Sequence, residues 1–224
     1  DYTVTLPTAV GNTGKTISFR MSTALTKLVT LDGNGSETID GALTRIMWAG
    51  ESCTLLSDGS NWFKIAGKTL PMYGSMYVLA TSIPNNTVTA VSLSTAILDN
   101  TGRMADTSGG AVTIRRPGTY DVYGMVSFDT SGGGTRFLGQ VRKNGSSVIQ
   151  GENSAQSGAY AHIPLTNLLA LVAGDALTFG VYQNSGGTVT LANSVDYTYL
   201  VATEVPARQY IDRRAARQQP RENL

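Results

Sequence analysis

Short runs of alternating apolar and polar residues, each closed by a glycine-bearing turn, recur along the chain up to about residue 205. Turns such as Asp58-Gly59 and Asn144-Gly145 favour tight hairpins, because glycine and asparagine tolerate the positive φ angles that these turns require. Helical spacing over ten or more residues occurs only at the C-terminal end. Many short strands joined by such turns predict an all-β fold.

The composition excludes several classes of protein. With 41% hydrophobic residues, the 224-residue chain can bury a core, and 17 basic against 16 acidic residues give no strong electrostatic bias. Cys53 is the only cysteine and His162 the only histidine, which excludes disulfide frameworks and cysteine- or histidine-rich metal sites. No apolar run reaches the ~18 residues of a membrane helix. We therefore expect no cofactor, no metal, no membrane insertion and no catalytic residue.

Changes in composition divide the chain into four segments. Residues 1–66 hold short strands, 67–75 carry Gly67, Pro71 and Gly74 and are predicted to be a connector, 76–205 hold longer strands, and 206–224 form a basic tail. Because a strand-like run follows Asp1 directly, we treat both ends as possible junctions with a longer chain.

Four stretches of the first segment match a known repeat: Tyr2–Pro7, Gly11–Ile17, Gly35–Gly41 and Gly50–Trp62. Each is a strand closed by a turn, and Trp62 and Phe63 supply large apolar anchors for a small core. In these residues the segment resembles a module of bacteriophage tail fibres and related virion appendages. The resemblance implies a location in the virion.

The third segment carries a second set of matching stretches, which are Gly118–Phe128, Lys143–Gly145, Leu169–Leu177 and Tyr197–Val205. In their order and spacing they resemble the superfamily of tumour necrosis factor and the complement globular heads. That resemblance implies a ten-stranded jelly-roll sandwich that assembles as a compact homotrimer. It also implies binding rather than catalysis.

Three stretches that contain glycine, asparagine or aspartate are better explained as turns than as ligand sites. Gly11–Thr16 lacks the first glycine of a phosphate-binding loop, since Ala9 stands at that position, and a strand-like run follows it instead of a helix. Asp32–Glu37 and Asp99-Asn100 offer oxygen ligands but lack the spacing of a calcium loop. We interpret all of them as tight turns.

The sequence offers only weak candidates for a catalytic pair of residues. His162 lies near Ser154 and Ser157, but no nucleophile elbow accompanies them. Asp129 and Glu152 follow strands and could flank a glycosidic bond, for which two carboxyl groups about 5–10 Å apart are needed. Loop carboxylates more often form turns.

The run from Tyr120 to Phe128 places two different faces on one strand. Tyr120, Val122, Val126 and Phe128 form an apolar face suited to the inside of a sandwich, whereas Asp121, Tyr123, Met125 and Ser127 lie opposite. In the resembling superfamily the matching strands line the threefold axis. We therefore predict that four residues bury against symmetry mates: Tyr123, Met125, Tyr197 and Tyr199.

Other partners would use the loops and the tail. Candidate receptor loops are Ser131–Thr135, Gly151–Ala159 and Gln183–Gly187, and the nearest aromatic residues, Tyr160 and Tyr182, are candidate receptor contacts that could stack on sugar rings. The tail from Ala207 can be drawn as a helix that docks on an acidic partner, or as a frayed terminus. Its candidate docking residues are Arg208, Arg213, Arg214 and Arg217. Nucleic-acid binding is disfavoured because the tail lacks aromatic platforms.

These patterns favour a bacteriophage fibre or spike with a trimeric jelly-roll head that binds a host-surface saccharide or protein. One alternative is a structural head fibre or capsid decoration protein with no receptor role, which contacts only other virion proteins. A third is an enzyme, a polysaccharide depolymerase.

Overall fold

The computed structural model describes all of the 224 residues except 24–26, 102, 130–133, 156–159, 193 and 207–224. All of the regular secondary structure in the described part is β-strand, which confirms the all-β class. Among the same residues, none forms a helix long and apolar enough to cross a membrane. The chain divides into two compact units, Asp1–Leu70 and Pro71–Leu224. We call the second unit the head.

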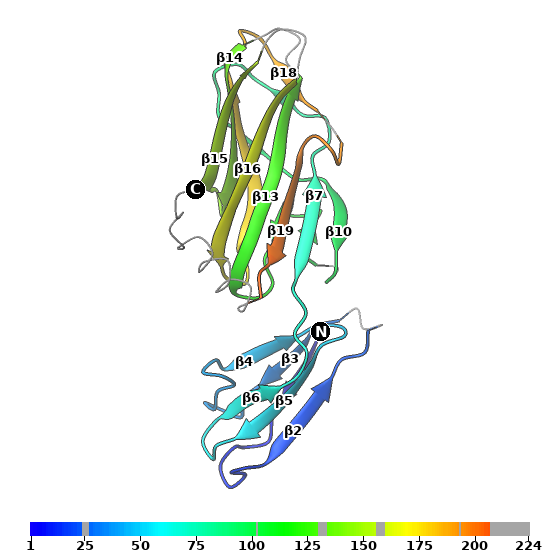
Figure 1. Ribbon diagram of the computed structural model, residues 1–224, viewed down its shortest axis with the longest axis vertical. Helices are drawn as coiled ribbons and strands as arrows, with labels where there is room; N and C mark the ends of the chain where they lie inside the picture. Colours follow the sequence, from blue (N-terminus) through cyan, green and yellow to red (C-terminus); the bar gives the residue numbers. More distant parts are fainter. Residues whose placement is uncertain (24–26, 102, 130–133, 156–159, 193, 207–224) are drawn as a thin grey trace, which may run out of the picture. The chain divides into compact units, whose positions relative to one another are not determined.

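The first unit contains two three-stranded sheets (Figure 1). One has the order β1 (Tyr2–Thr5), β3 (Val29–Asp32), β4 (Thr44–Met47), and the other β2 (Thr16–Arg20), β5 (Ser52–Ser57), β6 (Trp62–Ala66). Only the β1–β3 pair among these is parallel. Between the sheets lies a core that includes Leu31, Leu55 and Trp62.

Trp62 and Phe63 have opposite roles in this small core. Trp62 is 1% exposed, and its indole N–H donates to the carbonyl of Pro7 at 3.2 Å. Phe63 is 41% exposed, so the prediction that both residues anchor the core is wrong for Phe63. Neighbouring residues of one strand face opposite sides of the sheet, and only one of the two can point inward. Cys53 is buried, and that burial raises the pKa of its thiol and disfavours the reactive thiolate.

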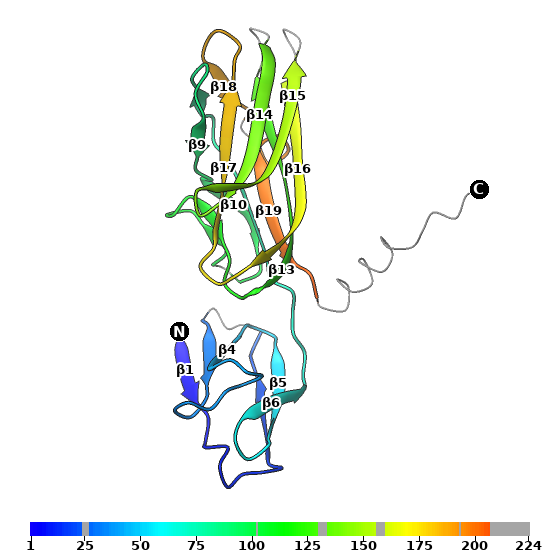
Figure 2. The same ribbon diagram turned by 90° about the vertical axis from the view of Figure 1, so that its left-hand side faces the viewer.

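The head is a sandwich of two sheets (Figures 1 and 2). One sheet contains β10 (Thr95–Asp99), β7 (Tyr73–Tyr77), β19 (Tyr199–Glu204), β13 (Gly118–Asp129), β18 (Val189–Leu191) and β8 (Ser82–Ile83), with β16 (Tyr160–Leu171) paired to β13. The other contains β11 (Ala105–Asp106), β12 (Ala111–Thr113), β17 (Ala176–Gln183), β14 (Gly134–Lys143) and β15 (Ser146–Ala155), with β9 (Thr89–Val91) paired to β17.

The strand order identifies the head as a jelly roll. In the first sheet, the order β7-β19-β13-β16 places the first strand of the head next to its last. In the second sheet, the order β12-β17-β14-β15 likewise pairs β12 with β17, a strand far from it in the sequence. Two Greek keys interleaved in this way form a jelly roll. The flanking strands β10 and β11 extend the two sheets, and the short strands β8, β9 and β18 are additional.

The local sequence explains which residues of β13 form the core of the head and where the chain turns between β14 and β15. Tyr120, Val122, Val126 and Phe128 are each 0% exposed, as the alternation along β13 predicts. Asn144 and Gly145 have φ angles of 50° and 83°, so the turn between β14 and β15 is the tight hairpin expected for Asn-Gly.

The head begins inside the stretch predicted to be a connector. Its first strand, β7, starts at Tyr73. Gly74 is a packing residue, because a Cβ at this position would lie 2.5 Å from the Cβ of Met104. Glycine in this stretch favoured a connector, but at Gly74 it permits a close approach within the sandwich instead.

Tyr120 makes the head less stable at alkaline pH. Its hydroxyl donates to the carbonyl of Arg116 at 2.8 Å, and burial raises its pKa far above the ordinary value. The unfolded chain ionises this tyrosine near pH 10 while the folded chain keeps it protonated, so this stability is full below about pH 10 and is lost as the pH rises further.

We expect Tyr120→Phe to lose about 1 kcal/mol at neutral pH with the hydrogen bond. Above pH 10 its unfolding free energy is expected to fall less steeply than that of the wild type, by up to about 1.4 kcal/mol per pH unit. Urea unfolding at neutral and alkaline pH measures both effects. Parallel decline of the two proteins above pH 10 would contradict this role of Tyr120.

Candidate functional site

The outer face of the β7-β19-β13-β16 sheet carries an exposed aromatic cluster. Strand register places Tyr123 opposite Val201 and Met125 opposite Tyr199. The rings of Tyr123 and Tyr199 meet edge to face, with centroids 6.5 Å apart and planes at 80°. Tyr123 is 43% exposed, and Met125 and Tyr199 are partly exposed. We call Tyr123, Met125 and Tyr199 the mid-sheet cluster.

A second cluster lies at the end of the same face, where β13 ends and β16 begins. The rings of Tyr160, His162 and Tyr197 lie with their planes within 30° of one another and their centroids 5.2–5.9 Å apart. Tyr160 is 47% exposed and Tyr197 is 38% exposed. The sequence assigned these two tyrosines to different surfaces, and the structure brings them together. We call the three residues the end cluster.

Buried hydroxyl groups hold the end cluster in place. Ser127, 0% exposed, donates its hydroxyl to the carbonyl of Tyr197 at 2.7 Å and accepts the Nδ1–H of His162 at 2.8 Å. Thr198, also 0% exposed, accepts the backbone N–H of Ser127 at 3.3 Å. The ring of His162 and the backbone of Tyr197 are therefore fixed to β13 through one serine.

A hollow of about 170 Å³ lies beside the end cluster. In strand register, Asp129 stands between Thr190 of β18 and Tyr160 of β16, so these three side chains form a row. The hollow is lined by Asp129, Tyr160, Thr190, Leu191, Ala192 and Tyr197. We call it the end hollow.

Tyr182, the other candidate receptor contact, lies on the second sheet and is engaged there. The guanidinium of Arg136 lies 5.5 Å from the centre of its ring, and its hydroxyl donates to Asn86 at 3.0 Å. Arg136 also pairs with Glu152 at 3.0 Å. Tyr160 and Tyr182 therefore do not belong to one site.

Among the described residues, which do not include Ser157, the catalytic pairs considered from the sequence are not assembled. His162 does bond to a serine, but that serine is the buried Ser127, whose proton is committed to a carbonyl. Asp129 lies on the outer face of the first sheet and Glu152 on that of the second, so the sandwich separates them. No group of three potential metal ligands occurs among the described residues.

The suspected ligand loops form turns in the structure. Gly11 and Gly14 have positive φ angles and the strand β2 follows them. Glu37 accepts the Thr8 hydroxyl at 2.6 Å, which lowers the pKa of its carboxyl group. Asp99 accepts the backbone N–H groups of Thr101 and Ala105.

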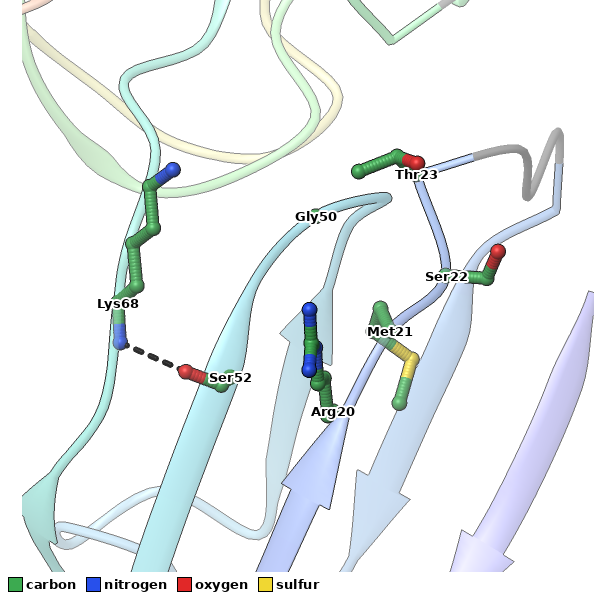
Figure 3. Close-up of a pocket in the computed structure, with 7 residues that line it drawn as sticks. All are labelled: Arg20, Met21, Ser22, Thr23, Gly50, Ser52 and Lys68. Atoms are coloured by element: carbon green, nitrogen blue, oxygen red, sulfur yellow. Dashed lines mark hydrogen bonds between the residues drawn. The ribbon is translucent and has the colours of Figure 1, made fainter.

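A separate hollow of about 640 Å³ lies in the first unit (Figure 3). Its lining is Arg20, Met21, Ser22, Thr23, Gly50, Ser52 and Lys68, in which the backbone N–H of Lys68 donates to Ser52 at 3.0 Å. The charged ends of Arg20 and Lys68 lie apart in this view, so they do not meet at one point (Figure 3). Sequence reasoning did not single out this hollow.

Two sets of predicted contacts fall outside the described residues. They are the docking tail, with Arg208, Arg213, Arg214 and Arg217, and parts of the receptor loops, residues 131–133 and 156–159.

Comparison with known proteins identifies similar folds only. No family model matches the chain, and no curated protein matches it. Among solved structures, murine APRIL at pH 8.5 is 18% identical with a TM-score of 0.48, covering 61% of this chain and all of APRIL. Eiger TNF from S. frugiperda is 12% identical with a TM-score of 0.46, covering 69% and 100%. The globular domain of zebrafish complement 1qA is 11% identical with a TM-score of 0.42, covering 60% and 96%. The strand order described above, and not these values, makes the head a jelly roll.

Proposed function

We propose that this chain is a bacteriophage virion fibre or spike protein whose jelly-roll head forms a homotrimer and binds the host cell surface. The resemblance of residues 1–65 to tail-fibre modules supports the virion location. The jelly-roll head supports a role in binding, and the mid-sheet cluster supports the trimer.

The exposed mid-sheet cluster is the observation that carries the proposal. Tyr123, Met125 and Tyr199 lie side by side on the outer sheet face, with Pro164 and Val201 as strand neighbours. Large contiguous apolar patches on an outer face mark interaction surfaces. A cyclic trimer buries the same patch three times, because each copy turns the same face toward the axis.

A rigid head can present variable contacts at its end. The chain leaves this end of the sandwich after β13 and β15, at residues that lie outside the described part, and loops on a rigid β scaffold can change without disturbing its core. We place host recognition at this end of the head, by non-covalent contact.

Competition for adsorption tests the proposal. Purified full-length protein, added to host cells before the phage, is expected to reduce adsorption, and an antibody against the head is expected to label appendage tips in electron micrographs. Unchanged adsorption together with labelling spread over the capsid shell would overturn it.

The same experiment distinguishes the proposed function from a second candidate, a head fibre or capsid decoration protein without a receptor role. The feature that favours it is the tail, in which five arginines stand against Asp212 and Glu222 and could anchor to an acidic shell. A depolymerase receives no support from the separated Asp129 and Glu152.

A further inference from the structure

The end hollow combines aromatic rings, a carboxylate and a hydroxyl group in one place. Tyr160 and Tyr197 supply the rings, Asp129 the carboxylate and Thr190 the hydroxyl. Asp129 and Thr190 are paired residues of adjacent strands, and both are exposed. Asp129, Tyr160 and Thr190 thus come from strands of one sheet, and Tyr197 comes from the segment that Ser127 anchors.

This combination matches the surface of a pyranose ring. One face of such a sugar is formed mainly by C–H groups, which pack against the electron-rich face of a tyrosine. Its edge carries hydroxyl groups, which donate to a carboxylate and exchange hydrogen bonds with a threonine. A carboxylate in the hollow repels a sugar that carries its own negative charge.

The alternatives for this hollow fit less well. A cage for a quaternary ammonium group encloses the cation with rings at steep angles, whereas the planes of Tyr160 and Tyr197 differ by only 21°. An anion site needs cationic or N–H donors, and no lysine or arginine is among the described residues that line the hollow.

The hollow is also separate from the mid-sheet cluster. Met125, the cluster residue nearest to Asp129 on β13, lies four residues away, which corresponds to about 13 Å along an extended strand. Assembly through Tyr123 and ligand binding beside Asp129 therefore use different parts of the same face.

We propose that the end hollow binds one uncharged pyranose unit of a cell-surface polysaccharide, with the ring of Tyr160 as the stacking surface and Asp129 as the hydroxyl acceptor. This inference rests on the proposed role in host binding and names its ligand class. The site is preorganised in part, because Ser127 fixes the ring of His162 and the backbone of Tyr197, and the ring of Tyr160 packs against both of their rings.

Saturation-transfer NMR on the full-length protein tests the site with four probes, the methyl glycosides of glucose, galactose, N-acetylglucosamine and glucuronic acid. At least one neutral glycoside is expected to bind with a millimolar dissociation constant, and Tyr160→Ala to weaken it by about tenfold or more. The glucuronide is expected to bind several-fold more weakly than the glucoside, and Asp129→Asn to remove that difference. Tyr73→Ala, at a tyrosine 37% exposed on the same sheet, is the matched control and is expected to bind as the wild type does.

The outcomes separate this inference from the proposed function. If no neutral glycoside binds, or if Tyr160→Ala binds like the wild type, the saccharide site is wrong even where the protein still competes for adsorption. If Tyr160→Ala loses competition while no glycoside binds, the ligand is a protein and the inference is likewise overturned. If the glycosides bind as expected but the protein does not compete for adsorption, the site stands and host attachment fails.

Discussion

Full-length protein carrying Tyr123→Asp is expected to sediment as a monomer or to fail to fold. The substitution places a carboxylate in the middle of the mid-sheet cluster, beside Tyr199. Interface aromatics cost about 2 kcal/mol or more when truncated, and a trimer contains three copies of each. A buried carboxylate without a partner adds several kcal/mol for each copy.

Two further variants make the result specific. Val172→Asp introduces the same charge at a residue of the head that is 58% exposed and follows β16, and it is expected to remain trimeric. Tyr123→Phe keeps the ring and is expected to remain trimeric as well. Light scattering gives the mass of each protein, and a stable, fully trimeric Tyr123→Asp protein would rule out this face as the contact.

Gly124→Val is expected to destabilise the head by about 3 kcal/mol or more, at the upper end of overpacking effects. A Cβ at this position would lie 2.6 Å from the backbone oxygen of Tyr199 and 3.2 Å from Cζ of Phe179. The strand cannot shift to relieve the clash, because Gly124 is paired with Leu165 on one side and Leu200 on the other.

Urea unfolding followed by circular dichroism measures this effect. Gly187→Ala is the control, since nothing lies within 4 Å of a Cβ at that position, and we expect a change within about 0.5 kcal/mol. An unfolding midpoint for Gly124→Val equal to that of the wild type would show that the strand spacing at β13 is not as tight as described.

The sequence predicts features that depend on one strand or one turn. The alternation along β13 identifies Tyr120 and Phe128 as core and Tyr123 as outward-facing, because side-chain direction repeats every two residues. The hairpin at Asn144-Gly145 depends on the φ angles of those two residues alone. Such features need no knowledge of a distant partner.

The end hollow could not be predicted in the same way. It depends on the register that places Asp129 opposite Tyr160, thirty-one positions later, and opposite Thr190 on the other side. A shift of one residue would turn every side chain of β16 to the other face. No local pattern distinguishes these registers, which is why Tyr160 and Tyr197 were assigned to different surfaces.

The buried serine of the end cluster was missed for a similar reason. Ser127 lies on the same side of β13 as Tyr123, the side predicted to face the threefold axis, but within one chain the segment that includes Tyr197 already covers it. A small polar residue between Val126 and Phe128 gives no sign of that cover. Only the long-range packing of this segment on β13 makes Ser127 a positioning residue.

Sedimentation velocity of the wild-type protein over a range of dilutions tests the central claim most directly. If the mid-sheet cluster assembles the head, the mass is three times the 23.6 kDa of one chain and stays constant on dilution. A species of 23.6 kDa at all concentrations would mean that Tyr123, Met125 and Tyr199 remain in solvent, and it would contradict the account of this face as the trimer contact.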